Sequence, residues 1–258
     1  MLLAMALAAA ANPAVAVWTE DFSGAPIDLG DRPLAFSEEF DGEVSLTGPK
    51  LFAPVHAPYG AGKFDPPTGP AYQIADGVLS LRAYKTPEGT WRSGTVQTVD
   101  KAGQGFTCAD CYFEARIKLP SIKTSAFWGG LWLLSNDDPV TGHAEIDVLE
   151  WYGGDPKGHH QAVHLWQKAP LGHSGSSNYT GMGTRLLDGE WHTYGAQRRG
   201  DTVTFYMDRQ EVSRAVVGPG FSVSYYPLVS LTINPGELAD AVDGMTLQVD
   251  YIRAYAAE

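Results

Sequence analysis

The sequence predicts an all-β protein, a jelly-roll sandwich of two antiparallel sheets, and three observations support this prediction. Gly (29) and Pro (17) are abundant and charged residues make up only 19 % of the 258 residues, a composition typical of turn-rich β proteins. After the N-terminus, no long stretch has the i, i+3, i+4 spacing of apolar residues that marks an amphipathic helix. Short segments that alternate apolar and polar residues recur instead, separated by Gly, Pro, Asp or Asn.

Four segments show this alternation clearly, and each is predicted to be a strand: residues 77–84, 112–120, 202–212 and 247–255. Alternation is typical of a strand with one face on the core and the other on solvent or a cleft. In the last segment, several apolar residues compete for the inward face: Leu247, Val249, Tyr251, and Ala254 or Tyr255. Sheet packed on sheet is therefore the expected architecture.

The N-terminal segment 1–16 is predicted to be a secretory signal peptide. It is apolar and ends in the small-x-small pattern Ala14-Val15-Ala16. It has no Lys or Arg before the apolar run, and the alternative is a buried N-terminal helix. The run is too short to span a bilayer. We therefore expect an exported protein, extracellular or periplasmic, with residues 17–258 as one domain because no linker, repeat or charge block divides them.

The net charge of −12 and the sequence pI near 4.9 weigh against some partners. A field of this sign disfavours nucleic acid and anionic membrane surfaces. It also weighs against highly sulfated polymers as substrates. It does not discriminate among neutral ligands.

Two cysteines, Cys108 and Cys111, stand in "TCADCYF" just before a predicted strand. Two cysteines alone cannot complete a four-ligand zinc site, and no His/Cys pair at ligand spacing follows closely. A thioredoxin-like redox role needs a βαβ context, which is missing. In an exported chain the pair is expected to form a short disulfide that pins a turn.

The stretch "HAEIDVLEWYG" (143–153) places three acids, Glu145, Asp147 and Glu150, in an otherwise apolar strand. Shielding such charges from water costs several kcal/mol each unless they are paired or protonated. The acids are therefore expected either to bind a cation or to carry out proton chemistry.

The spacing of these acids predicts a β-bulge. Glu145 and Asp147 are two residues apart and share a face of the strand, whereas strict alternation sends Glu150 to the opposite face. One extra residue near 148–149 turns Glu150 to the face of the other two, with Ile146 packed inward. The three carboxylates then line an open concave face.

Paired carboxylates on one face fit glycosidic bond cleavage. Two Glu side chains that lean together can approach the ~5–5.5 Å separation of retaining glycosidases, against ~6.5–9.5 Å for inverting ones. Asp147 between them is expected to hold one glutamate and to raise the pKa of the other by like-charge repulsion. Aromatic residues that could stack on sugar rings surround the acids in the sequence: Trp128, Trp132, Trp151, Tyr152 and Trp166. Any one of these tryptophans could equally pack in the core, and a lone His164 is more often structural.

Taken together, the sequence resembles glycoside hydrolase family 16, the laminarinase and agarase group. The family signature Glu-x-Asp-x-x-Glu, in its bulged form, is matched by residues 145–150. Further similarity runs in order through nearly the whole chain, at residues 36–42, 112–120, 126–135, 188–208 and 249–255. Residues 86–106 and 162–166 most resemble bacterial endo-glycanases that trim exopolysaccharides. Two segments depart from the family pattern, the "CADCY" insert and "LTINPG" (231–236), and they leave the substrate open.

The resemblance implies a concanavalin A-like jelly roll that hydrolyses internal β-1,3 or β-1,3-1,4 bonds of a polysaccharide with retention. It implies Glu145 as nucleophile, Asp147 as its assistant and Glu150 as general acid/base. It implies a monomer that needs no cofactor for catalysis, with a possible structural Ca²⁺ on the convex side held by Asp250. The residues that it implies as sugar contacts, on the family pattern and the aromatic cluster, are Trp128, Trp132, Trp151, His164, Trp166 and Asn234.

Two alternatives stay open. In a lectin-type module, the three acids would hold Ca²⁺ and bind sugar without cleaving it, although such sites usually draw on loop residues and backbone carbonyls. In a transglycosylase on the same scaffold, the glycosyl unit would pass to a sugar instead of water.

Overall fold

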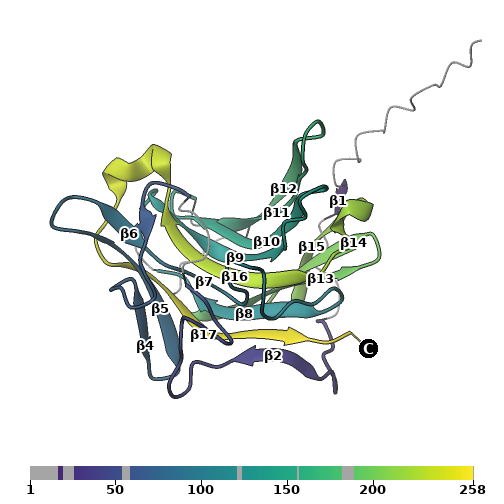
Figure 1. The fold of residues 1–258 in the computed structure, drawn as a ribbon, viewed down its shortest axis with the longest axis horizontal. Helices are drawn as coiled ribbons and strands as arrows, with labels where there is room; N and C mark the ends of the chain where they lie inside the picture. The colour runs from purple at the N-terminus through teal and green to yellow at the C-terminus, as the bar shows by residue number, and fades with distance from the viewer. Residues whose placement is uncertain are drawn as a thin grey trace, which may run out of the picture.

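A computed structural model describes residues 17–19, 26–53, 59–120, 124–155, 157–181 and 189–257. These residues form two β-sheets packed face to face, with two short 3-10 turns, η2 (Pro219–Phe221) and η3 (Pro235–Asp240), and no α-helix among them (Figure 1). The all-β jelly-roll prediction is thereby confirmed. The signal-peptide segment 1–16 lies outside the described residues. No helix in the described part of the chain has the length and apolarity needed to cross a membrane.

The larger sheet contains the N-terminal and C-terminal strands. Its main path runs β1-β15-β14-β13-β8-β17-β5-β6-β3, and β2 and β4 pair with β17 and β5. The pairs are antiparallel except for the short parallel pair of β3 with β6. Its strands are β1 (Val17–Thr19), β2 (Leu34–Glu38), β3 (Lys63–Phe64), β4 (Tyr72–Ala75), β5 (Val78–Lys85), β6 (Trp91–Ser93), β8 (Tyr112–Lys118), β13 (Trp191–Arg199), β14 (Thr202–Met207), β15 (Gln210–Val216) and β17 (Met245–Tyr255).

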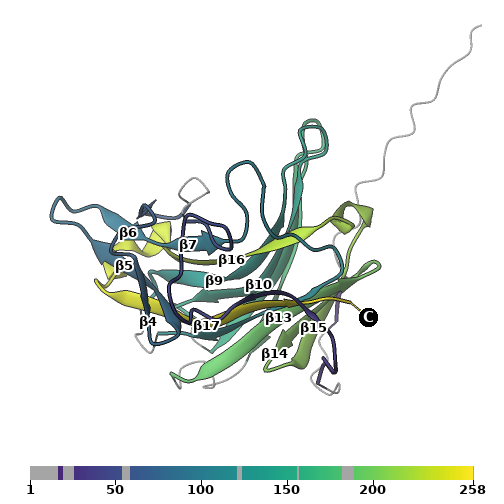
Figure 2. The ribbon, with the colours of Figure 1, turned by 60° about the horizontal axis from the view of Figure 1, so that its bottom comes forward.

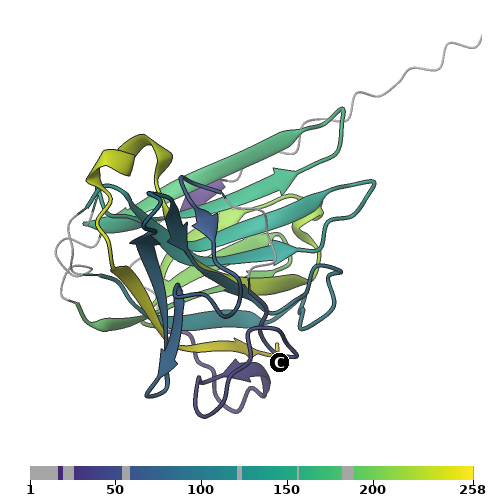
Figure 3. The same ribbon diagram turned by 60° about the vertical axis from the view of Figure 1, so that its left-hand side comes forward.

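The smaller sheet has the order β12-β11-β10-β9-β16-β7 and is antiparallel throughout its described pairs. In Figure 2, β16, β9 and β10 form one layer, with β17 and β13 in the other. The long green hairpin of β11 and β12 forms an edge of the smaller sheet (Figure 3). Its strands are β7 (Thr95–Gln97), β9 (Phe127–Ser135), β10 (His143–Tyr152), β11 (Gly158–Trp166), β12 (His173–Gly181) and β16 (Tyr225–Ile233).

One continuous hydrophobic core fills the space between the two sheets. Strand β8 contributes Phe113, Ala115 and Ile117, alternate residues of one face, and β10 contributes Ile146 and Val148 from the facing sheet. Alternate residues of each strand thus interdigitate, as expected for stacked sheets about 10 Å apart. The other face of the smaller sheet is left free of this core.

The predicted strand 202–212 is wrong, because these residues form parts of two strands joined by a tight turn. Strand β14 ends at Met207 and β15 begins at Gln210. The two residues between them, Asp208 and Arg209, have φ of 50° and 63°. Two consecutive positive φ values are typical of a two-residue type I′ hairpin turn, which preserves the alternation across the reversal. Arg rarely adopts this conformation, so the sequence carries only a weak turn signal here.

Strand β17 also departs from simple alternation. Leu247 and Val249 face the core as expected, but the pairing with β8 shifts between Val249 and Tyr251. This irregularity at Asp250 turns Tyr251 to the outer face, where its hydroxyl donates to Glu114 Oε1 at 2.9 Å. Ala254 therefore packs in the core, and Tyr255 lies in a separate cluster on the outer side.

Candidate active site

The predicted β-bulge in β10 is confirmed. Its pairing with β11 shifts between Asp147 and Glu150, and its pairing with β9 shifts between Asp147 and Leu149. Ile146 and Val148 point into the core and are 1 % exposed. Because of the extra residue, Glu145, Asp147 and Glu150 all reach the other face of the smaller sheet.

Gly130 on β9 provides the space for the bulge. It pairs with Glu150, and a Cβ added at this position would lie 1.6 Å from the carbonyl oxygen of Leu149 and 2.8 Å from its carbonyl carbon. No real side chain tolerates such a contact with backbone atoms. The bulged carbonyl can therefore occupy its position only because residue 130 is glycine.

The three acids line one pocket on the free face of the smaller sheet. Its volume is about 350 Å³, within the range of ligand-binding sites. The acids line it together with four aromatic rings, two glycines and three further side chains. The lining residues are Tyr59, Trp128, Gly129, Gly130, Trp132, Glu145, Asp147, Leu149, Glu150, Trp166, Ser230 and Thr232.

Trp128 and Trp132 stand on β9 four residues apart, so their side chains share the pocket face. Trp132 is fixed by a hydrogen bond from its Nε1 to Ser230 Oγ at 3.2 Å. Tyr59 meets both indole rings edge-on, with ring centroids 5.5 Å from Trp128 and 5.8 Å from Trp132. Tyr59 was not predicted, because it lies in an irregular segment with no periodicity to reveal its direction.

Tyr152 also belongs to the site. It follows Glu150 by two residues on the same strand and faces the same side. Its hydroxyl donates to Glu150 Oε1 at 2.9 Å, and its ring stacks on Trp128 at 5.7 Å between centroids. The spacing of two residues was the signal that could have assigned Tyr152 to Glu150.

Glu145 and Asp147 have partners on β11. Trp166 Nε1 donates to Glu145 Oε2 at 2.6 Å. His164 Nε2 lies 3.4 Å from Asp147 Oδ2, and its Nδ1 lies 3.0 Å from Nε2 of His173 on β12. The His164 ring can lean toward β12 because its neighbour there is Gly175, where an added Cβ would lie 2.1 Å from His164 Nδ1.

Burial raises the pKa of each of the three carboxyls. For Asp147, burial is joined by repulsion from Glu145 and Glu150, and its pKa lies well above the usual range. For Glu145, burial raises the pKa and the hydrogen bond from Trp166 partly offsets it. For Glu150, burial raises the pKa against the hydrogen bonds from Tyr152 and Trp128. Burial also lowers the pKa of His164 to about 4, so this imidazole is neutral at neutral pH. The site therefore retains protons on its acids above the pH at which free carboxyls lose them.

Three of the predicted sugar contacts do not line the pocket. One of them, His164, lies beside Asp147 instead. Trp151 is 0 % exposed and packs edge-on against Phe127 in the core, at 4.8 Å between centroids. The bulge that brings Glu150 to the pocket face necessarily sends the next residue inward, so the prediction for Trp151 is wrong. Asn234 lies at the end of β16, where its side chain accepts from Gly236 N at 3.1 Å and caps η3; it does not line the pocket.

The surroundings of Asp250 do not fit the calcium ion expected there. Asp250 Oδ2 accepts from Arg116 Nη1 at 2.7 Å, so a guanidinium already neutralises this carboxylate. Calcium sites gather six to eight oxygen ligands, and a carboxylate bound to a guanidinium is less available to be one of them. We assign no calcium to this position.

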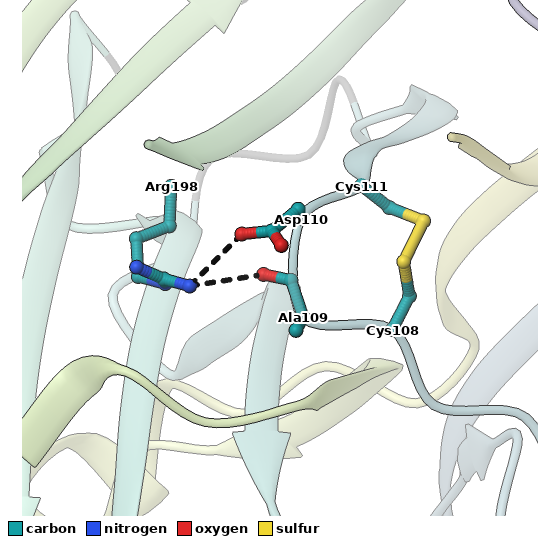
Figure 4. The surroundings of a disulfide bond; sticks show 5 residues. All are labelled: Cys108, Ala109, Asp110, Cys111 and Arg198. Atoms are coloured by element: carbon teal, nitrogen blue, oxygen red, sulfur yellow. Dashed lines mark hydrogen bonds and ion pairs between the residues drawn. A yellow bond between two sulfur atoms is a disulfide. The ribbon is translucent and has the colours of Figure 1, made fainter. Parts of the chain in front are cut away.

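The predicted disulfide is confirmed between Cys108 and Cys111, in the loop before β8 (Figure 4). Cys108 exchanges two backbone hydrogen bonds of 2.9 Å with Tyr225 at the start of β16. Between the cysteines, Asp110 Oδ1 accepts from Arg198 Nη2 at 3.0 Å. The loop is thus anchored to both sheets, and none of these residues lines the pocket.

A pocket that combines adjacent, largely shielded carboxyls with tryptophan rings, on the free face of a jelly roll, is typical of enzymes that cleave glycosidic bonds. The model of the glycosyl hydrolases family 16 matches residues 68–251, more than half of the chain. The chain therefore belongs to glycosyl hydrolase family 16 and is a glycoside hydrolase.

Solved structures show the same fold at low sequence identity. LamAcat from Zobellia galactanivorans is 20 % identical, with a TM-score of 0.69, covering 86 % of this chain and 97 % of that one. SCLam, a non-specific endo-β-1,3(4)-glucanase, is 18 % identical with a TM-score of 0.73, and the match covers 91 % of this chain and 95 % of SCLam. A mixed-linkage glucan enzyme of Bacteroides ovatus is 20 % identical with a TM-score of 0.69, and the match covers 85 % of this chain and 99 % of that one. No curated protein matches the sequence.

Proposed function

We propose that this glycoside hydrolase is a retaining endo-β-glycanase that cleaves internal β-1,3 or β-1,3-1,4 bonds of a polysaccharide. The observation that carries the proposal is the bulge in β10, which places Glu145, Asp147 and Glu150 in one aromatic-lined pocket. Two carboxylates that reach the same sugar ring from one strand suit a double displacement.

In this mechanism Glu145 attacks the anomeric carbon and forms a glycosyl-enzyme. A nucleophile must be ionised, and two contacts favour the ionised form of Glu145. Trp166 donates a hydrogen bond to it, and Asp147, whose own pKa is raised well above the usual range, retains a proton that it can donate. Because Asp147 is neutral, it adds no negative charge beside Glu145, so it does not oppose the ionisation of Glu145.

Glu150 is assigned as the general acid and base. Burial raises its pKa, which keeps the proton available for the departing oxygen near neutral pH. After the aglycone leaves, the ionised Glu150 accepts a hydrogen bond from Tyr152 and activates the incoming water. The product then keeps its β configuration.

The aromatic rings support a sugar-polymer substrate. Trp128, Trp132 and Trp166 present rings to the pocket, with Tyr59 beside the first two. Such faces bind the C–H faces of pyranose rings by apolar contact. SCLam, which shares the fold, is named as an endo-β-1,3(4)-glucanase. A net charge of −12 suits a neutral polymer better than a sulfated one.

The proposal includes export of the chain as a monomer that needs no cofactor for this chemistry. The described part of the chain begins with β1, which pairs with β15. Trp18 of β1 stacks on Phe205 and donates to Ser176 Oγ at 2.8 Å. Removal of residues 1–16 as a signal peptide would leave these contacts intact.

The test combines substrate screening with active-site variants. Reducing ends should be released from laminarin or mixed-linkage β-glucan, and NMR early in the reaction should show a β anomeric product. E145A and E150A should each lose several kcal/mol of transition-state stabilisation, at least about 10³-fold in kcat, and far less than additively when combined. Azide should restore turnover to E145A as an α-glycosyl azide and to E150A as a β-glycosyl azide, whereas E88A, an exposed glutamate, should be unchanged.

The same experiments distinguish the alternatives. Binding without any release of reducing ends would indicate a lectin. Products longer than the substrate would indicate transglycosylation. An initial α product, or full activity of E145A without azide, would refute the retaining mechanism.

A further inference from the structure

Beside the two glutamates lies a group of ligand atoms that the hydrolytic mechanism does not fully use. One potential ligand atom each from Glu145, Asp147 and His164 lies within 4.8 Å of the others. Asp147 is 5 % exposed, and its Oδ2 has no hydrogen-bond partner among the described residues. A buried carboxyl oxygen that faces an imidazole nitrogen without a hydrogen bond is a position where a ligand can bind, and a metal ion bound there would displace any proton on Asp147.

We propose that His164, Asp147 and Glu145 form a binding site for Zn²⁺, whose occupation blocks the catalytic pocket reversibly. The binding of the ion can be measured directly and does not depend on the sugar reaction inferred above, whereas the block of the pocket rests on the proposed function.

The spacing of the donors fits zinc better than a hydrogen bond. Donors held ~2.0–2.2 Å from a tetrahedral zinc ion lie about 3.3–3.6 Å apart. His164 Nε2 and Asp147 Oδ2 are 3.4 Å apart, inside this interval. Glu145 must approach by about 1 Å, within the freedom of a glutamate side chain. Its Oε2 accepts from Trp166 Nε1, which leaves the other oxygen to bind the ion.

The outer contacts of the site match those of a zinc-bound histidine. An imidazole that binds zinc through Nε2 carries its proton on Nδ1 and usually donates it to a neighbouring acceptor. Nδ1 of His164 lies 3.0 Å from Nε2 of His173, which can accept this proton. Gly175 leaves room for the His164 ring in this orientation. His173 is therefore a positioning residue of the proposed site.

Three protein ligands leave the fourth tetrahedral position open to the pocket, where water can bind. An ion bound there coordinates Glu145, so this residue cannot act as the nucleophile, and the ion occupies space that a sugar ring needs. An imidazole suits zinc and its neighbours in the transition series, whereas calcium and magnesium prefer oxygen ligands alone. The site should therefore discriminate against Ca²⁺ and Mg²⁺.

Isothermal calorimetry of the full chain with Zn²⁺ tests the proposal, and the visible absorption of bound Co²⁺ reports tetrahedral geometry. We expect one ion per chain, affinity reduced at least about tenfold in H164Q, and affinity reduced about 10- to 100-fold in H173Q. The matched control is H160Q, which changes a histidine on the same strand and face whose ring lies against Tyr152 and Tyr179. It should bind Zn²⁺ as the wild type does, and excess Ca²⁺ should not compete.

Several outcomes would overturn the proposal. These are the absence of saturable binding at millimolar Zn²⁺, equal affinity in H164Q and wild type, or equal losses in H160Q and H164Q. Binding lost in H143Q but kept in H164Q would instead place the ion on the surface pair His143 and Asp137. If H164Q does not fold, H173Q still tests the proposal, because His173 is exposed and its replacement should leave the fold intact. Unchanged Zn²⁺ affinity in H173Q would contradict the assigned geometry.

Discussion

Replacement of Gly130 by alanine should disable catalysis by displacing the bulge, although residue 130 contributes no side chain to the chemistry. The new Cβ would lie 1.6 Å from Leu149 O, where a relaxed carbon–oxygen contact needs about 3.2 Å, so one of the two backbones must shift by about 1.5 Å. Leu149 immediately precedes Glu150 in the bulge, and the shift is therefore passed to the proposed general acid.

The size of the effect follows from this displacement. Overpacking of a well-packed site costs about 1–3 kcal/mol of folding free energy. For a chain of this size each kcal/mol corresponds to about 2–4 °C in Tm, so we expect a decrease of roughly 2–12 °C. Misplacement of a catalytic group by about 1 Å costs on the order of 10²-fold in rate. The loss of kcat should therefore exceed what partial unfolding explains.

The assay is kcat on β-glucan well below Tm, with circular dichroism to establish the folded fraction. Gly129→Ala is the matched control, because its Cβ would meet Phe127 Cε1 at 2.8 Å and Leu247 Cδ1 at 3.1 Å in the core, not the bulge. G129A should lose stability but retain kcat per folded molecule. Folded G130A with kcat within threefold of the wild type would refute the role assigned to the bulge.

Three further predictions concern other parts of the chain. Tyr152→Phe removes a donor that stabilises ionised Glu150, so the pKa of Glu150 should rise. The alkaline limb of the pH–rate profile should then move to higher pH by about 1 unit. An unchanged alkaline limb would show that Tyr152 does not control the protonation of Glu150. Cys108→Ser opens a four-residue loop and should cost about 2 kcal/mol by loop-closure entropy, measured by denaturant unfolding, with kcat retained; lost activity at unchanged stability would contradict a structural role. Intact mass of the secreted protein should place the mature N-terminus near Val17, and retention of Met1 would exclude the signal peptide.

Much of the fold was predictable because alternation along a strand reports directly which face is buried. The predicted segments 77–84 and 112–120 correspond closely to β5 and β8. The prediction failed where the backbone breaks the alternation without an obvious residue signal. Asp208 and Arg209 reverse the chain with two positive φ values, and the irregularity at Asp250 moves Tyr251 to the outer face.

For the site, the spacing of the acids was sufficient to predict the bulge, because three carboxylates cannot be buried in a hydrophobic core without partners. The same reasoning, carried one residue further, excludes Trp151 from the pocket. Tyr59 and His173 were not predictable. Each comes from a segment distant in sequence from the acids and reaches the site only through the pairing of strands and loops.

The sequence by itself thus determined the all-β class, the side of β10 on which Glu145, Asp147 and Glu150 lie, and the family. These properties depend on local periodicity and on the cost of burying charge, both of which a linear pattern records. Only the tertiary structure decided which aromatic rings share the pocket with the acids, that Gly130 makes room for the bulged carbonyl, and that His173 supports His164 beside Asp147. These contacts depend on the register between strands that are far apart in the chain, and register is set by packing of the whole sandwich, not by any one segment.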